Sequence, residues 1–402
     1  MVREHNNEGN DAAGSERTAS NLMKTTQGNQ AATFRNQDQI WPHRRIRRGE
    51  AVRPLPPHDR PLVEQAYRVG DVMIDIDDFM ARRRTAGFLI LKNGEIALER
   101  YGMGNGPESR WASFSIAKSM TATLVGAALR DGAIGGLDEC CDHHLPQLRG
   151  SAYEGVTIRN LLRMASGVAW DERARSDGPD LWRLGRALRL RQPGAIVELL
   201  RTLPRAAPQG AIFNYATGES FLLAAVVAAA VGRPLADYFA QVVWAPAGME
   251  ADALWQLESP DGQELGGMGV SARLRDLGRF GLLVMADGET TGGKHVLPKG
   301  WRDLAGQPDC AATAFGRIMD GSPAGYGYHW WALPGAPFAD GLHAGAFLAL
   351  GAFGQRIYIN PGEQLVAVIQ SAWRQPADSD AEAETVALLR TLVRALRTAP
   401  AA

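Results

Sequence analysis

The amino-acid sequence predicts an α+β fold in which both ends of the chain contribute strands to one sheet and a helical part lies between them. Two observations support this prediction. Strand-like runs separated by turn residues occur at residues 87–101 and again within 325–370. Between these regions, apolar residues recur mainly at helical spacing. Strands at both ends with helices inserted between them indicate a sheet domain that carries a helical domain.

These patterns divide the chain into three parts. Residues 1–50 are polar and without period, so we expect a largely disordered or extended N-terminal segment. Residues 51–120 and 265–402 are expected to form the α/β domain, and residues 121–264 the helical domain. The proline-rich stretch Pro54–Pro57 marks the entry into the packed domain.

The sheet is expected to contain two hairpins. Residues 87–92 and 95–101 flank Asn-Gly, the dipeptide that two-residue hairpin turns favour. Residues 355–359 and 364–370 flank a turn that contains Asn-Pro-Gly. A final helix is expected over residues 380–397.

The middle of the chain is expected to be mainly helical. Apolar runs and amphipathic spacing predict helices over residues 120–129, 157–164, 181–190, 195–203, 220–231 and 271–285. The fifth of these helices is closed by Gly-Arg-Pro, which is a good stop signal.

Composition and charge exclude several classes of protein. The chain has 402 residues, of which 45% are hydrophobic, enough for one large domain or two of ordinary size. The formal net charge of −1 gives no electrostatic basis for binding nucleic acid or an anionic membrane surface. The basic cluster His43–Arg48 is therefore interpreted as a solvated segment that crosses the surface.

Cysteine usage and hydropathy favour a cytoplasmic protein. Cys140, Cys141 and Cys310 form neither a disulfide framework nor a zinc-like spacing, and reduced thiols are the simplest interpretation. The N-terminus lacks the apolar core of a secretory signal, and no run reaches about 18 uninterrupted apolar residues. We therefore expect neither export nor a membrane span.

Ser115 and Lys118 are the first candidates for catalysis. They lie three residues apart at the start of the apolar run Met120–Leu129, and residues i and i+3 share one face of a helix. The lysine amine would then lie beside the serine hydroxyl, and the serine N–H would be an unpaired donor at the helix start. A purely structural lysine would normally lie on the solvated stripe, because burial of an unpaired lysine is costly. The pattern therefore favours a nucleophile next to its base.

Tyr215 is a candidate for a second proton-transfer group. It lies in the loop Phe213–Ser220 that leads into an apolar helix. A serine hydroxyl needs a neighbouring base, and a lysine can act as one only if its pKa falls well below about 10.4. A tyrosinate can share that task, whereas a tyrosine standing alone would be read as an ordinary half-buried aromatic residue.

Two of these motifs resemble those of a known family. Phe114–Ser119 resembles the Ser-x-x-Lys helix of serine β-lactamases, penicillin-binding proteins and their relatives. Tyr215-Ala-Thr217 resembles the Tyr-x-Asn motif of the class C branch, with Thr217 in place of the asparagine. The likeness is strongest to the esterase and 6-aminohexanoate-dimer hydrolase branch and covers residues 60–398. It implies a β-lactamase/transpeptidase-like fold, with an antiparallel sheet flanked by helices, an inserted all-helical domain and the site between them.

The third motif of this family is matched by Ala349–Gln355. Ala349 takes the place of the lysine that anchors a carboxylate in β-lactamases. The resemblance implies that the backbone N–H groups of Ser115 and Ala352 form the oxyanion hole. Gly351 would allow a close backbone approach, and Gly351 and Phe353 are candidate substrate-binding residues. The alternative for this glycine-rich stretch is a turn that enters a strand.

A further candidate for substrate binding is Trp170, although a packed core tryptophan is an equal alternative. Nylon-oligomer hydrolases carry a tyrosine in the loop that follows this position, and that tyrosine is implicated in amide turnover. This chain has Arg173-Ala174 there, so a preference for esters or for amides is left open.

Together these motifs predict a serine hydrolase that cleaves a small ester or amide. The acyl-enzyme would form on Ser115, activated by Lys118 and Tyr215, with no metal and no cofactor. The alternatives are a D,D-peptidase or β-lactamase and, from a different class, a non-catalytic binding module of the same fold. The expected partner is a small-molecule ester or amide substrate, with no nucleic acid and no membrane, and the oligomeric state stays open.

Overall fold

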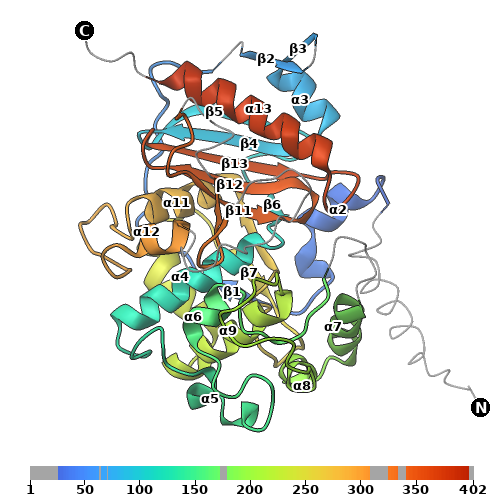
Figure 1. Cartoon of the computed structure of the whole chain (residues 1–402). Helices are drawn as coiled ribbons and strands as arrows, with labels where there is room; N and C mark the ends of the chain where they lie inside the picture. The colour runs from blue at the N-terminus through green and yellow to red at the C-terminus, as the bar shows by residue number, and fades with distance from the viewer. Residues whose placement is uncertain are drawn as a thin grey trace, which may run out of the picture.

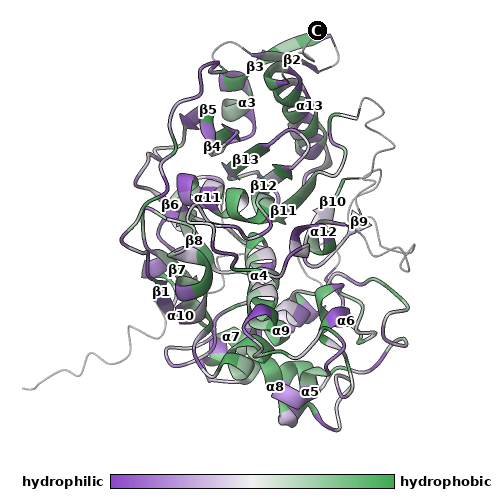
Figure 2. Cartoon of the chain, turned by 90° about the vertical axis from the view of Figure 1, so that its left-hand side faces the viewer, coloured by the Kyte–Doolittle hydropathy of each residue, from purple (hydrophilic) through white to green (hydrophobic). Residues whose placement is uncertain are grey.

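The computed structural model describes residues 26–62, 65–69, 71–172, 179–307, 325–333 and 341–397. A layered sheet region occupies one half of the molecule and a mainly helical region the other (Figure 1). The large sheet lies between α13 (Ser379–Leu396) with α3 (Ile76–Arg82) on one face and α11 (Leu274–Met285) on the other (Figures 1 and 2). This arrangement confirms the expected α+β class.

The large sheet is antiparallel throughout its described pairs, as expected. Its order is β5-β4-β13-β12-β11-β10-β9, so the early hairpin joins the late strands through the pairing of β4 with β13. The strands are β4 (Thr85–Lys92), β5 (Glu95–Tyr101), β9 (Gly325–Tyr326), β10 (Trp331–Ala332), β11 (Phe347–Gly351), β12 (Gln355–Asn360) and β13 (Leu365–Ser371). The central strands β12 and β13 are buried on both faces, and β13 is mainly hydrophobic (Figure 2).

Local sequence explains the two hairpins of this sheet. Asn93 and Gly94 both have positive φ, at +54° and +83°, which is the conformation that a two-residue hairpin turn requires. The second hairpin joins β12 to β13, with Asn360 paired to Leu365. Both predicted hairpins are therefore present.

A smaller antiparallel sheet joins the two halves of the molecule. Its order is β1-β7-β8-β6, formed by β1 (His43–Ile46), β7 (Ala253–Gln256), β8 (Val270–Arg273) and β6 (Arg110–Ala112). The strand β7 lies within residues 121–264, which are otherwise largely helical. A third, two-stranded sheet pairs β2 (Ala66–Val69) with β3 (Val72–Asp75).

The N-terminal segment is partly folded. Residues 1–25, half of the segment expected to be disordered or extended, lie outside the described residues. Residues 30–46 form a short helix, α2 (Gln30–Arg35), and the edge strand β1. In β1, His43 and Arg45 are exposed, whereas Ile46 is buried and Arg44 pairs with Glu264. The basic cluster is thus solvated on one face only.

Most of the remaining helices build the region below the sheet in Figure 1, whereas α12 lies beside the sheet. They are α4 (Ile116–Arg130), α5 (Cys141–His144), α6 (Ile158–Leu162), α7 (Pro179–Leu190), α8 (Ala195–Arg201), α9 (Thr217–Val231), α10 (Leu235–Phe239) and α12 (Trp301–Gly306). Within the described residues, no single helix is long and apolar enough to cross a membrane. One pair, Thr217–Val231 with Leu235–Trp244, reaches that length and composition only together, and it is bent by 74°.

Candidate active site

Ser115 lies where a sharp loop enters α4. It occupies the N-cap position of the helix, and its side chain is half-buried. The preceding residue, Phe114, has φ +48°, a left-handed conformation that is uncommon for a large side chain. Because the first N–H groups of a helix have no intrahelical acceptor, the backbone at Ser115 can offer a donor to a ligand.

Lys118 points its amine at this serine. Its Nζ donates to Ser115 Oγ at 2.9 Å and to the carbonyl oxygen of Gly267 at 2.8 Å. The lysine is 1% exposed, and burial lowers its pKa to about 8, although the nearby Glu172 carboxylate opposes this shift. A large fraction of Lys118 is therefore neutral near pH 8, and a neutral amine can accept the serine proton.

Tyr215 reaches the same serine from the loop before α9. Its hydroxyl is hydrogen-bonded to Ser115, and its ring centroid lies 5.1 Å from the Lys118 amine. Burial raises the pKa of Tyr215 above its usual value, so the phenol stays protonated at neutral pH. The ring packs against both Tyr326 and Trp331, with centroid distances of 6.0 Å and 5.6 Å. The structure thus brings together the three side chains that the motifs singled out.

The end of β11 lies against the loop that carries the serine. A Cβ added at Gly351 would lie 2.4 Å from the Ser113 carbonyl oxygen, so only glycine permits this approach. Ala352 follows in a short turn, Ala352–Gly354, and Phe353 has φ +63°. Ala349 is buried in β11 opposite Ile357, at the position where β-lactamases carry a lysine.

The aromatic cluster that supports both loops was not predicted. Phe34 of α2 is fully buried, and its ring centroid lies 4.9 Å from Phe114 and 5.2 Å from Phe353. These two residues contact each other at 5.4 Å. Phe34 therefore packs on the residue before Ser115 and on the residue after Ala352, and Phe353 is a packed residue with 3% exposure. A short helix with one apolar anchor leaves no periodic signal in the sequence.

Trp170 is packed as well, at 6% exposure. Its ring lies 2.9 Å from the Cβ position of Gly218 in α9, and its Nε1 donates to Glu172 at 2.7 Å. Glu172 itself was missed by sequence reasoning, because an acidic residue in an aperiodic loop carries no signal. Arg173 and Ala174, which bear on amide turnover, lie outside the described residues.

Among the described residues, no group of three or more His, Cys, Asp or Glu side chains is placed to hold a metal ion. The polar groups that interact around Ser115 include an amine, a phenol and the Glu172 carboxylate. This set is suited to proton transfer.

The chain was compared with known proteins. Residues 75–392 match the Beta-lactamase family. The 6-aminohexanoate-dimer hydrolase of Paenarthrobacter ureafaciens is 26% identical over 309 residues, which cover 75% of this chain and 76% of that protein. A Bacillus anthracis structure assigned as a 6-aminohexanoate-dimer hydrolase has a TM-score of 0.78 at 22% identity, covering 92% of this chain and 95% of its own. A D-stereospecific amidohydrolase from Streptomyces sp. has a TM-score of 0.55 at 18% identity, covering 75% and 93%.

The matched range spans more than half of the chain, so the protein belongs to the Beta-lactamase family. Family and fold together support a hydrolase, and they confirm the resemblance and the fold class that the sequence indicated. The structural neighbours are less than 25% identical and therefore bear on the fold alone.

Proposed function

We propose that this protein is a serine hydrolase that cleaves a small ester or amide through an acyl-enzyme on Ser115. The observation that carries the proposal is the 2.9 Å contact between Lys118 Nζ and Ser115 Oγ, made by a lysine whose pKa is lowered to about 8 by burial. The hydrogen bond between Tyr215 and the same serine supports a shared proton-transfer group.

The proposed reaction has two stages. Neutral Lys118 accepts the Ser115 proton as Oγ attacks the carbonyl carbon, and the backbone N–H groups of Ser115 and Ala352 stabilise the oxyanion. Protonated Lys118, with Tyr215 beside it, returns a proton to the leaving alcohol or amine as the scissile bond breaks. In the second stage water attacks the acyl-enzyme, and the same groups remove its proton and restore the serine hydroxyl.

The β-lactamase and D,D-peptidase alternatives have less support. Ala349 offers no cation to a substrate carboxylate, and a charge-assisted hydrogen bond of that kind contributes roughly 1.5–3 kcal/mol. A non-catalytic binding module would have no need for a buried lysine in contact with a serine, since burying an amine is unfavourable. We therefore place an ester or amide hydrolase first.

The test compares Ser115→Ala with a matched control, Ser113→Ala. The Ser113 hydroxyl is buried and has no hydrogen-bond partner among the described residues, so its removal should leave both fold and activity intact. Wild type and Ser113→Ala should hydrolyse a short-chain p-nitrophenyl ester and be labelled by a fluorophosphonate, whereas Ser115→Ala should do neither. Retained turnover in Ser115→Ala would rule the assignment out.

A linear 6-aminohexanoate dimer assayed in parallel separates the two substrate classes. Release of 6-aminohexanoate would make the protein an amidase as well as an esterase. Ester turnover without dimer cleavage would restrict it to esters. A wild type that is neither labelled nor active would favour the binding module.

A further inference from the structure

Glu172 is a carboxylate beside the proposed catalytic group that none of the three motifs includes. It accepts three hydrogen bonds: from the Trp170 Nε1 at 2.7 Å, from the Thr217 backbone N–H at 2.6 Å, and from the Thr217 hydroxyl. None of these donors is a cation. The carboxylate is thus held in place by neutral partners.

These hydrogen bonds connect Glu172 to both proton-transfer groups. Thr217 is two residues after Tyr215 and begins α9, so Glu172 fixes the loop that carries the tyrosine. The other side of Thr217 packs on Gly267, whose Cβ position lies 2.9 Å from Thr217 Cγ2 and from its carbonyl oxygen. The Gly267 carbonyl is in turn an acceptor for the Lys118 amine. A continuous chain of contacts therefore runs from Glu172 to Lys118.

We propose that Glu172 is a positioning residue that orients the Tyr215–Thr217 segment and whose negative charge sets the pH at which Lys118 becomes a base. The inference rests on the proposed serine hydrolase and adds a residue to its machinery. Where the class C motif has an asparagine, this chain has Thr217, whose hydroxyl is used to bind the carboxylate.

The direction of the charge effect follows from its sign. A negative charge near an amine favours the protonated form, so Glu172 raises the pKa of Lys118 against the effect of burial. It also raises the pKa of Tyr215, because it disfavours the phenolate. Removing the charge should lower both pKa values and move the pH at which labelling begins to lower pH.

Other titratable groups also face this region. His329 lies behind Lys118, with its ring nitrogens 3.2 Å and 3.3 Å from the carbonyl oxygens of Lys118 and Leu161. Burial lowers the pKa of His329 to about 4, so its charge does not change near neutral pH. Tyr326 interacts electrostatically with both Glu172 and Glu219, and the backbone N–H of the neighbouring Asp171 donates to Asp180.

Glu172→Gln can remove the charge while it keeps the contacts. The Gln oxygen can accept from Trp170 and the Thr217 N–H, and the Gln amide can donate to the Thr217 hydroxyl, which is able to rotate. Thr217→Val is the matched control, because it deletes the hydroxyl contact but leaves the charge. Glu219→Gln is a second control, a buried carboxylate on the same helix whose partner is Ser166.

The experiment measures the rate at which a fluorophosphonate labels Ser115 as a function of pH. We expect the rate of wild type to rise with pH around the Lys118 pKa of about 8. In Glu172→Gln the midpoint should fall by about half a unit to one unit, as expected for one charge at short range. Thr217→Val and Glu219→Gln should keep the wild-type midpoint, although Thr217→Val should reduce the maximal rate.

An unchanged midpoint in Glu172→Gln would overturn the inference, as would an equal shift in Thr217→Val. Glu172→Ala makes the same charge change without replacement hydrogen bonds, and it gives a second measurement should the glutamine variant fold poorly. If wild type is not labelled at any pH, the proposed function itself fails. A labelled wild type with an unshifted Glu172→Gln defeats only the role of Glu172.

Discussion

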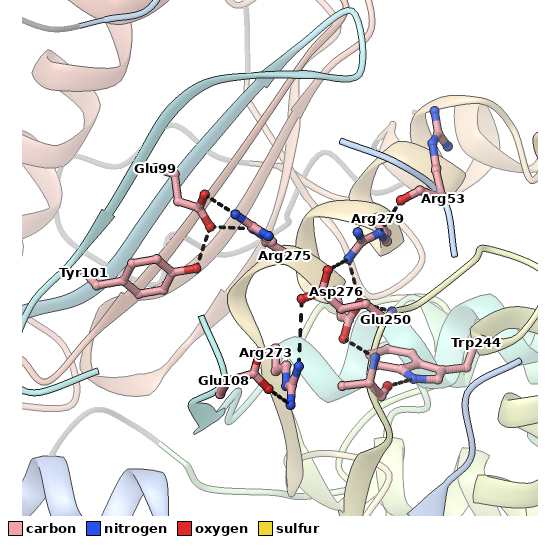
Figure 3. A network of polar contacts seen from close by, with 11 residues as sticks. Arg53, Glu99, Tyr101, Glu108, Trp244, Glu250, Arg273, Arg275, Asp276 and Arg279 are labelled. Atoms are coloured by element: carbon pink, nitrogen blue, oxygen red, sulfur yellow. Dashed lines mark hydrogen bonds and ion pairs between the residues drawn. The ribbon is translucent and has the colours of Figure 1, made fainter. Parts of the chain in front are cut away.

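Two of the buried cations of this protein, Lys118 and Arg279, have different surroundings. Lys118 is 1% exposed and Arg279 is 3% exposed. The guanidinium of Arg279 lies 3.0 Å from Asp276 and 2.9 Å from Glu250, and its Nε donates to the Arg53 carbonyl oxygen at 2.9 Å (Figure 3). The amine of Lys118 contacts a hydroxyl and a carbonyl, and no carboxylate in the described part of the chain touches it.

Burial therefore has different consequences for the two cations: Arg279 stabilises the fold through its ion pairs, whereas Lys118 has a lowered pKa. Arg279 forms ion pairs with two carboxylates, and the pair with Glu250 ties α11 to the chain around that residue. Figure 3 also shows Arg275 of the same helix paired with Glu99 of β5, at 2.7 Å. Lys118 lacks such compensation, and its pKa falls toward neutrality.

The largest expected effect is the loss of ester turnover on replacement of Lys118. Lys118→Met keeps the length of the side chain but deletes the proposed base, so ester turnover should fall by about 10²–10⁴-fold. The free energy of unfolding should be unchanged or higher, because an apolar side chain replaces a buried amine. Steady-state kinetics and urea unfolding measure the two quantities, and activity within tenfold of wild type would contradict the proposed role.

Replacing Arg279, the cation paired with two carboxylates, should reduce stability and leave turnover nearly unchanged. Arg279→Met leaves Asp276 and Glu250 close together without their partner, which should reduce the free energy of unfolding by roughly 3–5 kcal/mol. Turnover per folded molecule should stay near that of wild type. Arg302→Met is the control, because the Arg302–Asp303 pair is more exposed and such pairs contribute only about 0–1 kcal/mol.

Glu219 extends the comparison to a buried carboxylate, whose described hydrogen-bond partner is a serine and not a cation. Glu219 is 2% exposed and accepts a hydrogen bond from Ser166, and burial raises its pKa from 4.5 to about 8. The folded state therefore holds a proton that the unfolded state releases between these pH values. Stability from this group is complete below pH 4.5 and declines as the pH rises toward 8, by at most about 1.4 kcal/mol per unit.

Glu219→Gln should remove this decline, since glutamine does not titrate. Urea unfolding at pH 5 and pH 8 gives the change in the free energy of unfolding with pH for each protein. The difference in this change between wild type and variant measures the effect. Equal pH dependence in both proteins would show that Glu219 has an ordinary pKa in the folded state.

Contacts between residues that are close in the sequence could be predicted, whereas contacts between residues far apart in the chain could not. The Ser115–Lys118 contact follows from helical spacing, and the Asn-Gly hairpin follows from the turn conformation. Tyr215 could be placed beside them only through the family resemblance, because its partners are far away in the chain. Glu172 and Phe34 were missed for a related reason: a loop carboxylate and a single aromatic residue gain their roles only from the surfaces that fold against them.

The helix α2 lies before the range that matches the family, which begins at residue 75, yet its Phe34 packs on Trp111 as well as on the two strained phenylalanines. A shortened protein starting at that boundary would expose these aromatic rings to water. It would also lose β1 and leave β7 as an open sheet edge, which favours aggregation. A protein expressed for crystals or assays should therefore begin well before residue 75, so that it includes α2 and β1.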